Sequence, residues 1–427
     1  MDIPPSVSGA SEPMKIKFPL CATAITAGVL IVGSVGASSA EAKVTSSSFA
    51  SLGAAAKPAA SVTDAAGNLF TLNEGDNTIS KITPAGTVTR VFSSLGAGVS
   101  PQSMTIDPLG NLYVSCAGTD SVTRVSPSGA TIKYWSYDGV GSMPRGITSD
   151  AGGNVFVANY ANSTIMKIAA TGAVYPAFAR LDPADYTYGL ATDASGNIYA
   201  ADTATDRISK ISATGAVTEA FAQLPKDAHP VYVAVDSHGD VYSANSAGNV
   251  AKFASNGSVI DTNIMSAPGP SKPDNLMLDP YGDLFIADEF TNQITAVDPN
   301  GGDAGIIASL PTGSLARAEA ISGSIVYAPD YITGDVQRSD LRPAMSTAGL
   351  KTSIRRASRT SMAVTADGFE PLYAVSMGSL PPGLDLDAQT GRISGSPTTV
   401  GTYTFDILTM NHWGGSSPQH EVITVTP

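Results

Sequence analysis

An aspartate recurs every 43 residues along most of the chain, and this spacing limits what the chain can fold into more than any other feature. Three residues after each of these aspartates comes a glycine, and the next residue is Asn or Asp. An Asp-x-x-Gly-Asn/Asp run between two apolar stretches is typical of a hairpin turn, because Gly and Asn tolerate a positive φ. The repeat therefore predicts six copies of one β-hairpin unit. The repeat aspartates are Asp64, Asp107, Asp150, Asp193, Asp236 and Asp279.

Apolar stretches flank each of these turns, and two further strand patterns follow. In the second unit, Leu112-Tyr113-Val114 comes directly after the turn, and Val122 and Val125 lie in the next stretch. Gly129 then ends that stretch and begins a fourth one. Short apolar stretches bounded by turn residues are typical of β-strands. Four short strands in a unit of 43 residues are the pattern of a β-propeller blade.

A seventh unit is shorter than the other six. Residues 320–340 contain three strand patterns, and the repeat stops near Leu341. The missing fourth strand lies at the other end of the repeat region, because Val44 to Leu52 resembles Val88 to Leu95, the fourth strand of the first unit. Pairing of this segment with the seventh unit would join the two ends of the array and remove its open edges. We therefore expect an all-β fold, a seven-bladed β-propeller closed by its N-terminal strand.

The blade pattern as a whole resembles known families. Asp-x-x-Gly-Asn, a following apolar run such as Ile198-Tyr199-Ala200, and then Asn or Asp are similar to NHL repeats and to the blades of the virginiamycin B lyase family. The resemblance covers residues 43–342. It implies the propeller fold, but propellers of this kind include sensors, ligand-binding proteins and enzymes, so it leaves the function open.

A second domain is expected after the propeller. We predict a linker at 343–352 and a small domain at 353–427. Within it, Leu380-Pro381-Pro382-Gly383-Leu384 and Gly401-Thr402-Tyr403-Thr404-Phe405 resemble a bacterial immunoglobulin-like repeat that is common in surface and secreted proteins. The resemblance implies a β-sandwich that serves as a spacer or as an adhesive module toward other surface proteins.

The N-terminus predicts export from the cytoplasm. Lys15 and Lys17 precede an apolar run from Leu20 to Val35, and Ala40-Glu41-Ala42 offers small residues for cleavage. We expect residues 1–42 to be a signal peptide, with translation starting at Met14. The apolar run is too short for a stable membrane span, so a secreted or extracytoplasmic protein is expected.

The net charge argues against one class of binding partner, and the cysteine count argues against an internal disulfide. The net charge of −13 argues against nucleic acid, because a protein that binds phosphates needs a basic face. Cys21 lies in the predicted signal peptide, which leaves Cys116 alone in the mature chain. A single cysteine cannot form an internal disulfide, and it is expected to be a small buried residue.

Blade geometry selects one face of the ring for a ligand. The first strand of each blade runs toward the Asp-x-x-Gly turn and the second returns, so the start of the first strand and the end of the second share one mouth of the central channel. Side chains there that break the repeat are better candidates for a specific site than those that every blade shares. The predicted ligand-binding residues are Glu74, Gln102, Arg145, Tyr160, Tyr188, Asp274 and Glu289.

Polar residues also recur nine positions after the repeat aspartates. Their repetition favours a structural role, in which short polar side chains hydrogen-bond to nearby loop amides. A resemblance to gluconolactonase-type propellers, which hold a divalent cation in the channel with Glu, Asn and Asp, implies an alternative in which oxygen ligands bind Ca²⁺ or Mg²⁺. The predicted metal ligands are Glu74, Asn159, Asp202, Asn245 and Asp288.

Histidine is the commonest general base, and a lyase of the virginiamycin type would need such a base. His229 and His238 are the histidines of the predicted propeller. His238 lies in a repeat turn, at the wrong face, while His229 precedes Pro230 at the mouth.

The sequence therefore favours an exported ligand-binding or scaffold protein that recognises a polar small molecule, a peptide or a glycan. The alternative is a divalent-metal-dependent lyase, lactonase or hydrolase that uses the channel.

Overall fold

The computed structural model describes residue 44, residues 46–137, residue 139, and residues 141–265, 271–297, 305–369 and 371–427. In these ranges the regular structure is strands and one 3-10 turn, η1 (Ala117–Thr119), and no α-helix occurs. None of these residues belongs to a helix that is long and apolar enough to cross a membrane. The predicted signal peptide, residues 1–42, lies outside the described residues.

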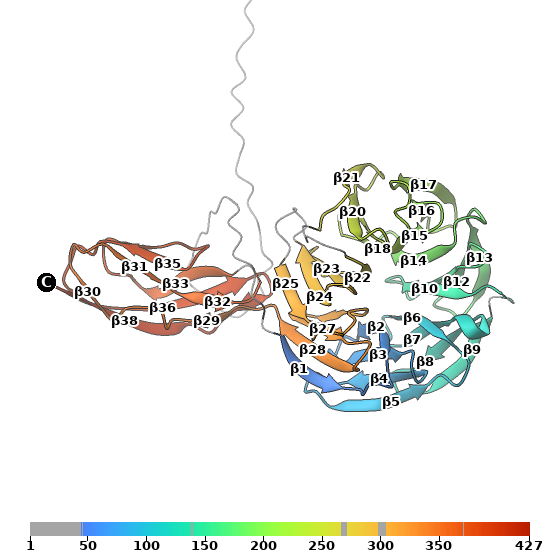
Figure 1. The fold of residues 1–427 in the computed structure, drawn as a ribbon, viewed down its shortest axis with the longest axis horizontal. Helices are drawn as coiled ribbons and strands as arrows, with labels where there is room; N and C mark the ends of the chain where they lie inside the picture. The colour runs from blue at the N-terminus through green and yellow to red at the C-terminus, as the bar shows by residue number, and fades with distance from the viewer. Residues whose placement is uncertain are drawn as a thin grey trace, which may run out of the picture. The chain divides into compact units, whose positions relative to one another are not determined.

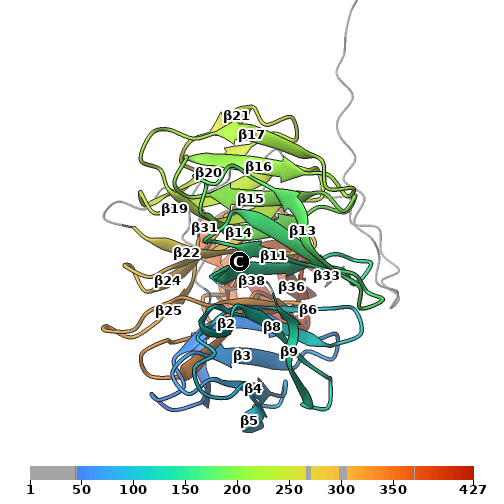
Figure 2. The ribbon, with the colours of Figure 1, turned by 90° about the vertical axis from the view of Figure 1, so that its right-hand side faces the viewer.

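Seven four-stranded sheets form within the described ranges, and together they make the ring of blades seen in Figure 1. Each sheet is antiparallel and ordered from the inside of the ring to the outside, as the blade β14-β15-β16-β17 shows in Figure 1, and Figure 2 shows the same blade from the side. The first, inner strands are β2 (Pro58–Thr63), β6 (Pro101–Ile106), β10 (Pro144–Ser149), β14 (Thr187–Thr192), β18 (Pro230–Val235), β22 (Pro273–Leu278) and β26 (Ala320–Ser322). The second strands are β3 (Leu69–Asn73), β7 (Leu112–Cys116), β11 (Val155–Asn159), β15 (Ile198–Asp202), β19 (Val241–Asn245), β23 (Leu284–Asp288) and β27 (Ile325–Pro329).

The two outer strands of each blade follow the same order. The third strands are β4 (Thr78–Ile82), β8 (Ser121–Val125), β12 (Thr164–Ile168), β16 (Arg207–Ile211), β20 (Asn249–Phe253), β24 (Gln293–Val297) and β28 (Asp335–Asp340). The fourth strands are β5 (Val88–Ser94), β9 (Thr131–Tyr137), β13 (Val174–Arg180), β17 (Val217–Gln223), β21 (Val259–Asp261), β25 (Gly305–Ser309) and, in the seventh blade, β1 (Ser46–Ser51).

The N-terminal strand closes the ring, as the sequence predicts. β1 pairs antiparallel with β28 from Ser46 opposite Ser339 to Ser51 opposite Asp335, and the two strands lie side by side in Figure 1. The backbone N–H of Leu52 continues the pairing by donating to the carbonyl of Gly334 at 2.8 Å. The first and last blades are thereby joined through sheet hydrogen bonds, which leaves no open edge between them.

The repeat turns explain why these residues are Asp, Gly and Asn. In the first blade Asp64 accepts hydrogen bonds from the backbone N–H groups of Ala66 and Asn68, and the Asn68 side chain donates to its second oxygen at 2.8 Å. Gly67 has a φ of +77°, which L side chains adopt at a cost. The aspartate therefore holds the hairpin between the first and second strands closed.

The hydrophobic core of the propeller lies between successive blades. One cluster joins Tyr199 and Ile208 of the fourth blade to Val233 and Val241 of the fifth, and similar clusters recur around the ring. Second strands carry the most buried side chains, because they are covered on both faces by neighbouring blades. This packing makes the inner ends of the blades a rigid frame for the mouth.

The C-terminal region forms a β-sandwich-like unit with its own core, in which Val364, Ile393, Phe405, Ile407 and Ile423 are buried. One difference from the sequence prediction concerns the linker: Ala344–Ser346, within the predicted linker 343–352, is a strand that pairs with residues 365–367. The segment is only three residues long and Met345 is its one large apolar residue, so it gave no strand signal. The strands are β29 (Ala344–Ser346), β30 (Ser353–Arg355), β31 (Thr360–Ala363), β32 (Thr365–Asp367), β33 (Leu372–Gly378), β34 (Leu384–Leu386), β35 (Arg392–Gly395), β36 (Gly401–Asn411), β37 (Gly414–Gly415) and β38 (Gln419–Thr426).

Candidate functional site

The start of each first strand and the end of each second strand meet at one mouth, as the blade geometry predicts. In the third blade Pro144 pairs with Asn159, and in the sixth Pro273 pairs with Asp288. The inner strands of the third, fourth and fifth blades also approach closely, because a Cβ on Gly146 would lie 2.3 Å from the Tyr188 carbonyl oxygen. Glycine is needed there, and the close approach brings the mouth residues of neighbouring blades into contact.

One side of the mouth is built from an arginine and tyrosines, and we call it the aromatic wall. The Arg145 guanidinium carbon lies 5.2 Å from the Tyr160 ring centroid and 5.1 Å from that of Tyr188. Its Nη1 also donates to the Tyr188 hydroxyl at 3.3 Å. Tyr188 contacts Tyr232 of the next blade with ring centroids 5.8 Å apart, and Tyr160 contacts Tyr186 at 5.3 Å. Cation–π and edge-to-face contacts of this kind hold the rings in fixed orientations.

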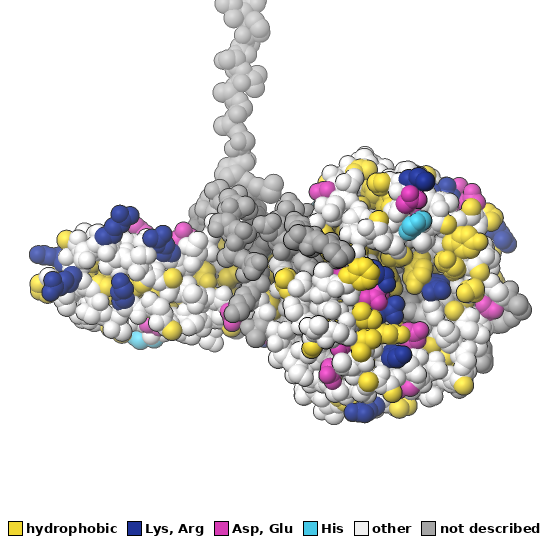
Figure 3. Space-filling model, viewed as in Figure 1, with side chains coloured by type: hydrophobic (Ala, Val, Ile, Leu, Met, Phe, Trp, Pro, Cys, Tyr) yellow, Lys and Arg dark blue, Asp and Glu magenta, His cyan; other side chains and the backbone are white. Residues whose placement is uncertain are grey.

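The other side of the mouth is a chain of ion pairs, and we call it the charged wall. Arg317 Nε lies 3.1 Å from Asp274 Oδ2 and 3.8 Å from Glu289 Oε1. Lys272 forms a further ion pair with Glu289. The chain of contacts continues into the first blade, because Arg317 lies over the Tyr331 ring and the Tyr331 hydroxyl donates to Glu74 at 3.0 Å. Figure 3 shows acidic and basic side chains around the centre of the propeller face.

A buried carboxyl group lies beneath the charged wall. Glu319 directly precedes the inner strand β26, at a position where the second to sixth blades have Met, Ile, Leu or Val and the first blade has Ser61. Neither of its carboxylate oxygens has a hydrogen-bond partner of good geometry. Burial raises the pKa of Glu319 to about 8, an effect that the neighbouring Asn275 side chain offsets only in part. Burial likewise raises the pKa of Asp274, against the opposing effect of Arg317. Glu319 is therefore held in surroundings that favour the proton-bound form.

The structure brings six of the seven predicted ligand-binding residues into the two walls. Arg145, Tyr160 and Tyr188 belong to the aromatic wall, and the three acidic residues belong to the charged wall. Gln102 is the exception, because its side chain hydrogen-bonds to Ser100 and Pro101 in its own blade. The wall residues that the prediction omitted lie at or beside the same strand ends, where their departure from the repeat was the available signal: Tyr186, Tyr232, Lys272, Arg317 and Tyr331.

The predicted metal ligands are held in five different blades. Asp202 accepts hydrogen bonds from Thr187 and Ser209 of its own blade, and Asp288 accepts from Ser271 and from the backbone of Phe290. Asn159 and Asn245 donate to Thr164 and Asn249 in theirs. No contact within the described ranges links two of the five predicted ligands. The Ca²⁺ or Mg²⁺ site stays a prediction, and these contacts favour structural roles for the four positions that repeat.

Asp202 is nevertheless unusual among these repeated positions. Burial raises its pKa to about 7, although the hydrogen bond from Ser209 opposes the shift. In the seventh blade the equivalent Asp330 behaves in the opposite way, because hydrogen bonds from Ser314, Thr333 and two backbone groups overcome burial and lower its pKa. The difference follows from the number of donors, since each N–H or O–H that points at the carboxylate stabilises its charged form.

The two propeller histidines lie apart from both walls. His229 is half exposed at the edge of the mouth, where its backbone N–H donates to Asp206 and its Nδ1 lies 3.0 Å from the Thr203 carbonyl oxygen. His238 is part of the repeat turn of the fifth blade, and its backbone N–H donates to Asp236. Neither ring contacts a residue of the aromatic or the charged wall among the described contacts.

Solved structures with the same propeller fold are similar over most of the chain. A streptogramin B lyase has a TM-score of 0.64 and 16% identity, covering 71% of this chain and 99% of its own. A catalytically inactive His-to-Ala variant of virginiamycin B lyase from Staphylococcus aureus, solved with quinupristin, has a TM-score of 0.63 and 14% identity, covering 70% and 100%. The extracellular domain of the "putative hybrid two component system" of B. thetaiotaomicron has a TM-score of 0.50 and 16% identity, covering 87% and 57%. No curated protein matches the chain.

Two sequence families match different parts of the chain. The family described as "Putative Ig domain" matches residues 341–426, the region of the C-terminal β-sandwich-like unit. The family described as "Virginiamycin B lyase family" matches residues 25–302, which is well over half of the 427 residues. The match agrees with the seven four-stranded blades and with the shared fold of the solved lyases. The chain therefore belongs to the virginiamycin B lyase family.

Proposed function

We propose that this protein is an exported recognition protein whose propeller mouth binds a polar ligand, a peptide or a glycan that carries a flat ring. The observation that carries the proposal is the pair of walls at one mouth. Side chains that break the repeat form two series of contacts there, one from Arg145 to Tyr232 in blades three to five and one from Asp274 to Glu74 in blades six, seven and one. Polar side chains that repeat bond within their own blades instead. Departures from a repeat that gather at one mouth are expected of a binding site.

The chemistry of the two walls defines the ligand class. Tyrosine faces held by Arg145 offer stacking surfaces for a planar or sugar ring. Carboxylates of the charged wall offer acceptors for hydroxyl or ammonium groups, while Arg317 offers donors. A ligand with both a ring and polar groups would use both walls together. The resemblance to an extracellular domain supports a location outside the cytoplasm.

Apolar side chains around the walls add contact area. Met143, Tyr186, Phe290 and Ile332 are exposed, and each lies next to a wall residue or at the start of an inner strand. Exposed apolar residues gathered at one place mark interaction sites more often than scattered ones. These four positions would pack against the apolar parts of a peptide or against the flat face of a sugar.

Two arginines of the third blade provide a matched test. Arg145 lies in the aromatic wall, whereas Arg180 is exposed at the end of the outer strand β13. Panels of short peptides and oligosaccharides would be screened by thermal shift, and each hit measured by calorimetry. We expect Arg145→Ala to weaken binding at least tenfold and Arg180→Ala to leave it unchanged. A ligand that both variants bind as well as the parent chain would place the binding site elsewhere.

A second candidate function is the lyase reaction of the family, and Glu319 is the observation that favours it. A carboxyl group with a pKa of about 8 keeps its proton at neutral pH and is suited to general acid catalysis. Virginiamycin B would be incubated with the protein, with Mg²⁺ and with a chelator, and the products followed by mass spectrometry. Turnover that Glu319→Gln abolishes would establish this function. Absence of turnover under every condition would leave recognition as the function.

A further inference from the structure

The repeat turn of the sixth blade keeps the backbone donors from Tyr281 and Asp283 but lacks the asparagine side-chain donor of the first four blades. In the first four blades an asparagine side chain donates to the second oxygen of the repeat aspartate at 2.7–2.8 Å. In the sixth blade this position is Asp283, which has no N–H to offer to Asp279. Two carboxylates therefore face each other in one turn. Burial and the charge of Asp283 raise the pKa of Asp279.

The fifth blade shows how the fold compensates for the same change. There Asp240 replaces the asparagine, but the Lys252 ammonium lies 3.3 Å from it. The Tyr242 hydroxyl also donates to Asp236 at 3.1 Å. Tyr242 and Lys252 pair with each other across the second and third strands of the fifth blade. In the sixth blade the equivalent pair is Phe285 and Ala296. Neither residue can supply a donor or a positive charge.

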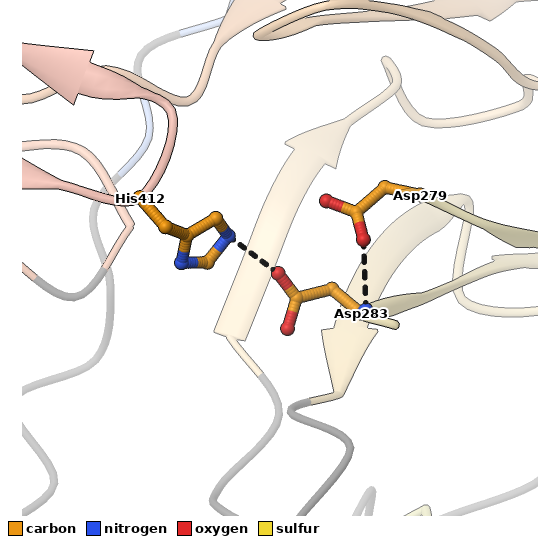
Figure 4. Close-up of side chains that lie close together, drawn as sticks. All are labelled: Asp279, Asp283 and His412. Carbon is orange, nitrogen blue, oxygen red and sulfur yellow. Dashed lines mark hydrogen bonds and ion pairs between the residues drawn. The ribbon is translucent and has the colours of Figure 1, made fainter. Parts of the chain in front are cut away.

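A histidine of the C-terminal domain lies beside this turn. His412 Nε2 is 2.8 Å from Asp283 Oδ2. Figure 4 shows the imidazole pointing toward this carboxylate. One ligand atom from each of Asp279, Asp283 and His412 lies within 4.8 Å of the other two. Asp279 and Asp283 are 6% and 2% exposed, and an oxygen of each, together with His412 Nε2, has no hydrogen-bond partner of good geometry. Three buried polar atoms thus converge without satisfying one another.

Neighbouring residues hold His412 in this position. The Asn411 side chain donates to the carbonyl oxygens of Leu341 at 2.6 Å and Phe369 at 2.7 Å. On the other side of His412, the Trp413 ring packs against Phe369 and Phe285, with centroids 5.3 Å and 6.4 Å apart. The imidazole is therefore presented to the turn by a loop that is anchored on both sides, which is the preorganisation that a ligand-binding site requires.

We propose that Asp279, Asp283 and His412 bind a divalent transition-metal ion, with Zn²⁺ as the best fit. One imidazole nitrogen and two carboxylate oxygens are ligands that Zn²⁺ uses in tetrahedral sites, with water in the fourth position. Ca²⁺ and Mg²⁺ prefer sites made of oxygen alone. Ligand atoms of a tetrahedral zinc site lie roughly 3.4 Å apart, so small side-chain movements would complete the geometry. The ion would supply the positive charge that Lys252 supplies in the fifth blade.

This site is distinct from the mouth. The turn between β22 and β23 is at the end of the blade opposite to the start of β22, where Asp274 and the charged wall lie. The ion would join blade six to a residue that follows it by more than a hundred positions in the sequence. Binding of an ion to the folded state alone stabilises that state in proportion to the logarithm of the metal concentration. The proposed ion would therefore stabilise the folded chain by linking the sixth blade to the C-terminal domain.

The test uses the full chain, stripped of metal with a chelator and titrated with Zn²⁺ by calorimetry and thermal shift. Asp283→Asn is the informative variant, because it restores the asparagine of blades one to four and is expected to fold. His412→Ala removes the imidazole. His420→Ala is the matched control, since His420 is an exposed histidine of the same domain, 2.7 Å from Asp406.

We expect one Zn²⁺ ion per chain, a rise in melting temperature with zinc, and at least a hundredfold weaker binding in Asp283→Asn and His412→Ala. His420→Ala should bind as the parent chain does. Co²⁺ in place of Zn²⁺ should give visible absorption bands that the same two variants lose. Absence of Zn²⁺ and Co²⁺ binding, or binding that survives Asp283→Asn, would overturn the proposal.

Discussion

Removing the side chain that follows the closing strand should destabilise the whole propeller. Leu52 is 5% exposed and belongs to a cluster with Leu69, Tyr327 and Val336, so it joins the first and seventh blades. Leu→Ala substitutions at such sites lose the transfer free energy of the side chain and leave a cavity, together about 2–5 kcal/mol. A middle value of about 3 kcal/mol corresponds to a roughly hundredfold change in the unfolding equilibrium. That is a large fraction of the stability of an ordinary domain.

The free energy of unfolding of Leu52→Ala would be measured by urea denaturation, with Val91→Ala as the control. Val91 lies on the outer strand β5 and is 60% exposed, so its truncation should change stability by less than about 0.5 kcal/mol. The midpoint for Leu52→Ala should fall without a change in the slope, since the same surface unfolds. Equal stabilities of the two variants would refute the closure of the ring through this strand.

Three further predictions concern buried polar groups. The folded chain keeps a proton on Glu319 up to its pKa of about 8, whereas an unfolded glutamate loses its proton near pH 4.3. The free energy of unfolding should therefore fall as the pH rises between these two values, and Glu319→Gln should make this fall smaller. The same dependence of the unfolding free energy on pH in both chains would contradict the prediction. Cys116 is fully buried, and burial raises the pKa of its thiol. A chain without residues 1–42, which contain Cys21, should therefore react with a thiol reagent only after unfolding. Stoichiometric labelling of the native chain would contradict this prediction. Asp107→Ala removes the acceptor of hydrogen bonds from Leu109, Asn111 and Tyr113, and it should lower the free energy of unfolding, measured by urea denaturation, by about 2–3 kcal/mol. A decrease of less than about 0.5 kcal/mol would count against a stabilising role for the turn aspartates.

The propeller was predictable because its information is local and repeated. Asp64 and Gly67 specify a turn by their own conformational preferences, and the same pair recurs in six blades, so errors in one blade are corrected by the others. Closure of the ring by residues 46–51 could also be predicted from the sequence, since this segment resembles a fourth strand that the seventh blade lacks. The strand at Ala344–Ser346 was not, because its three-residue pairing depends on a partner some twenty positions later.

The candidate site was predictable only in part. Strand ends placed Arg145 and Asp274 at one mouth, but their partners depend on which side chains of neighbouring blades meet there. Glu319 escaped prediction because it lies in the irregular seventh blade, where the register of the repeat is hard to follow. His412 could not have been assigned to the turn of Asp279 from sequence, because nothing in either segment encodes the contact between them.

Closure by β1 also sets the order in which the chain can complete its fold. Ser46 pairs with Ser339, so β1 leaves the ribosome almost three hundred residues before its partner. At typical rates of synthesis this is a wait of roughly 15–60 s. Contacts so distant in sequence are slow to form and leave edges open to aggregation meanwhile. The strand suits that wait: four of its six residues are serines, and Phe49 is its one large apolar side chain, so it offers other chains little to bind before its own blade arrives.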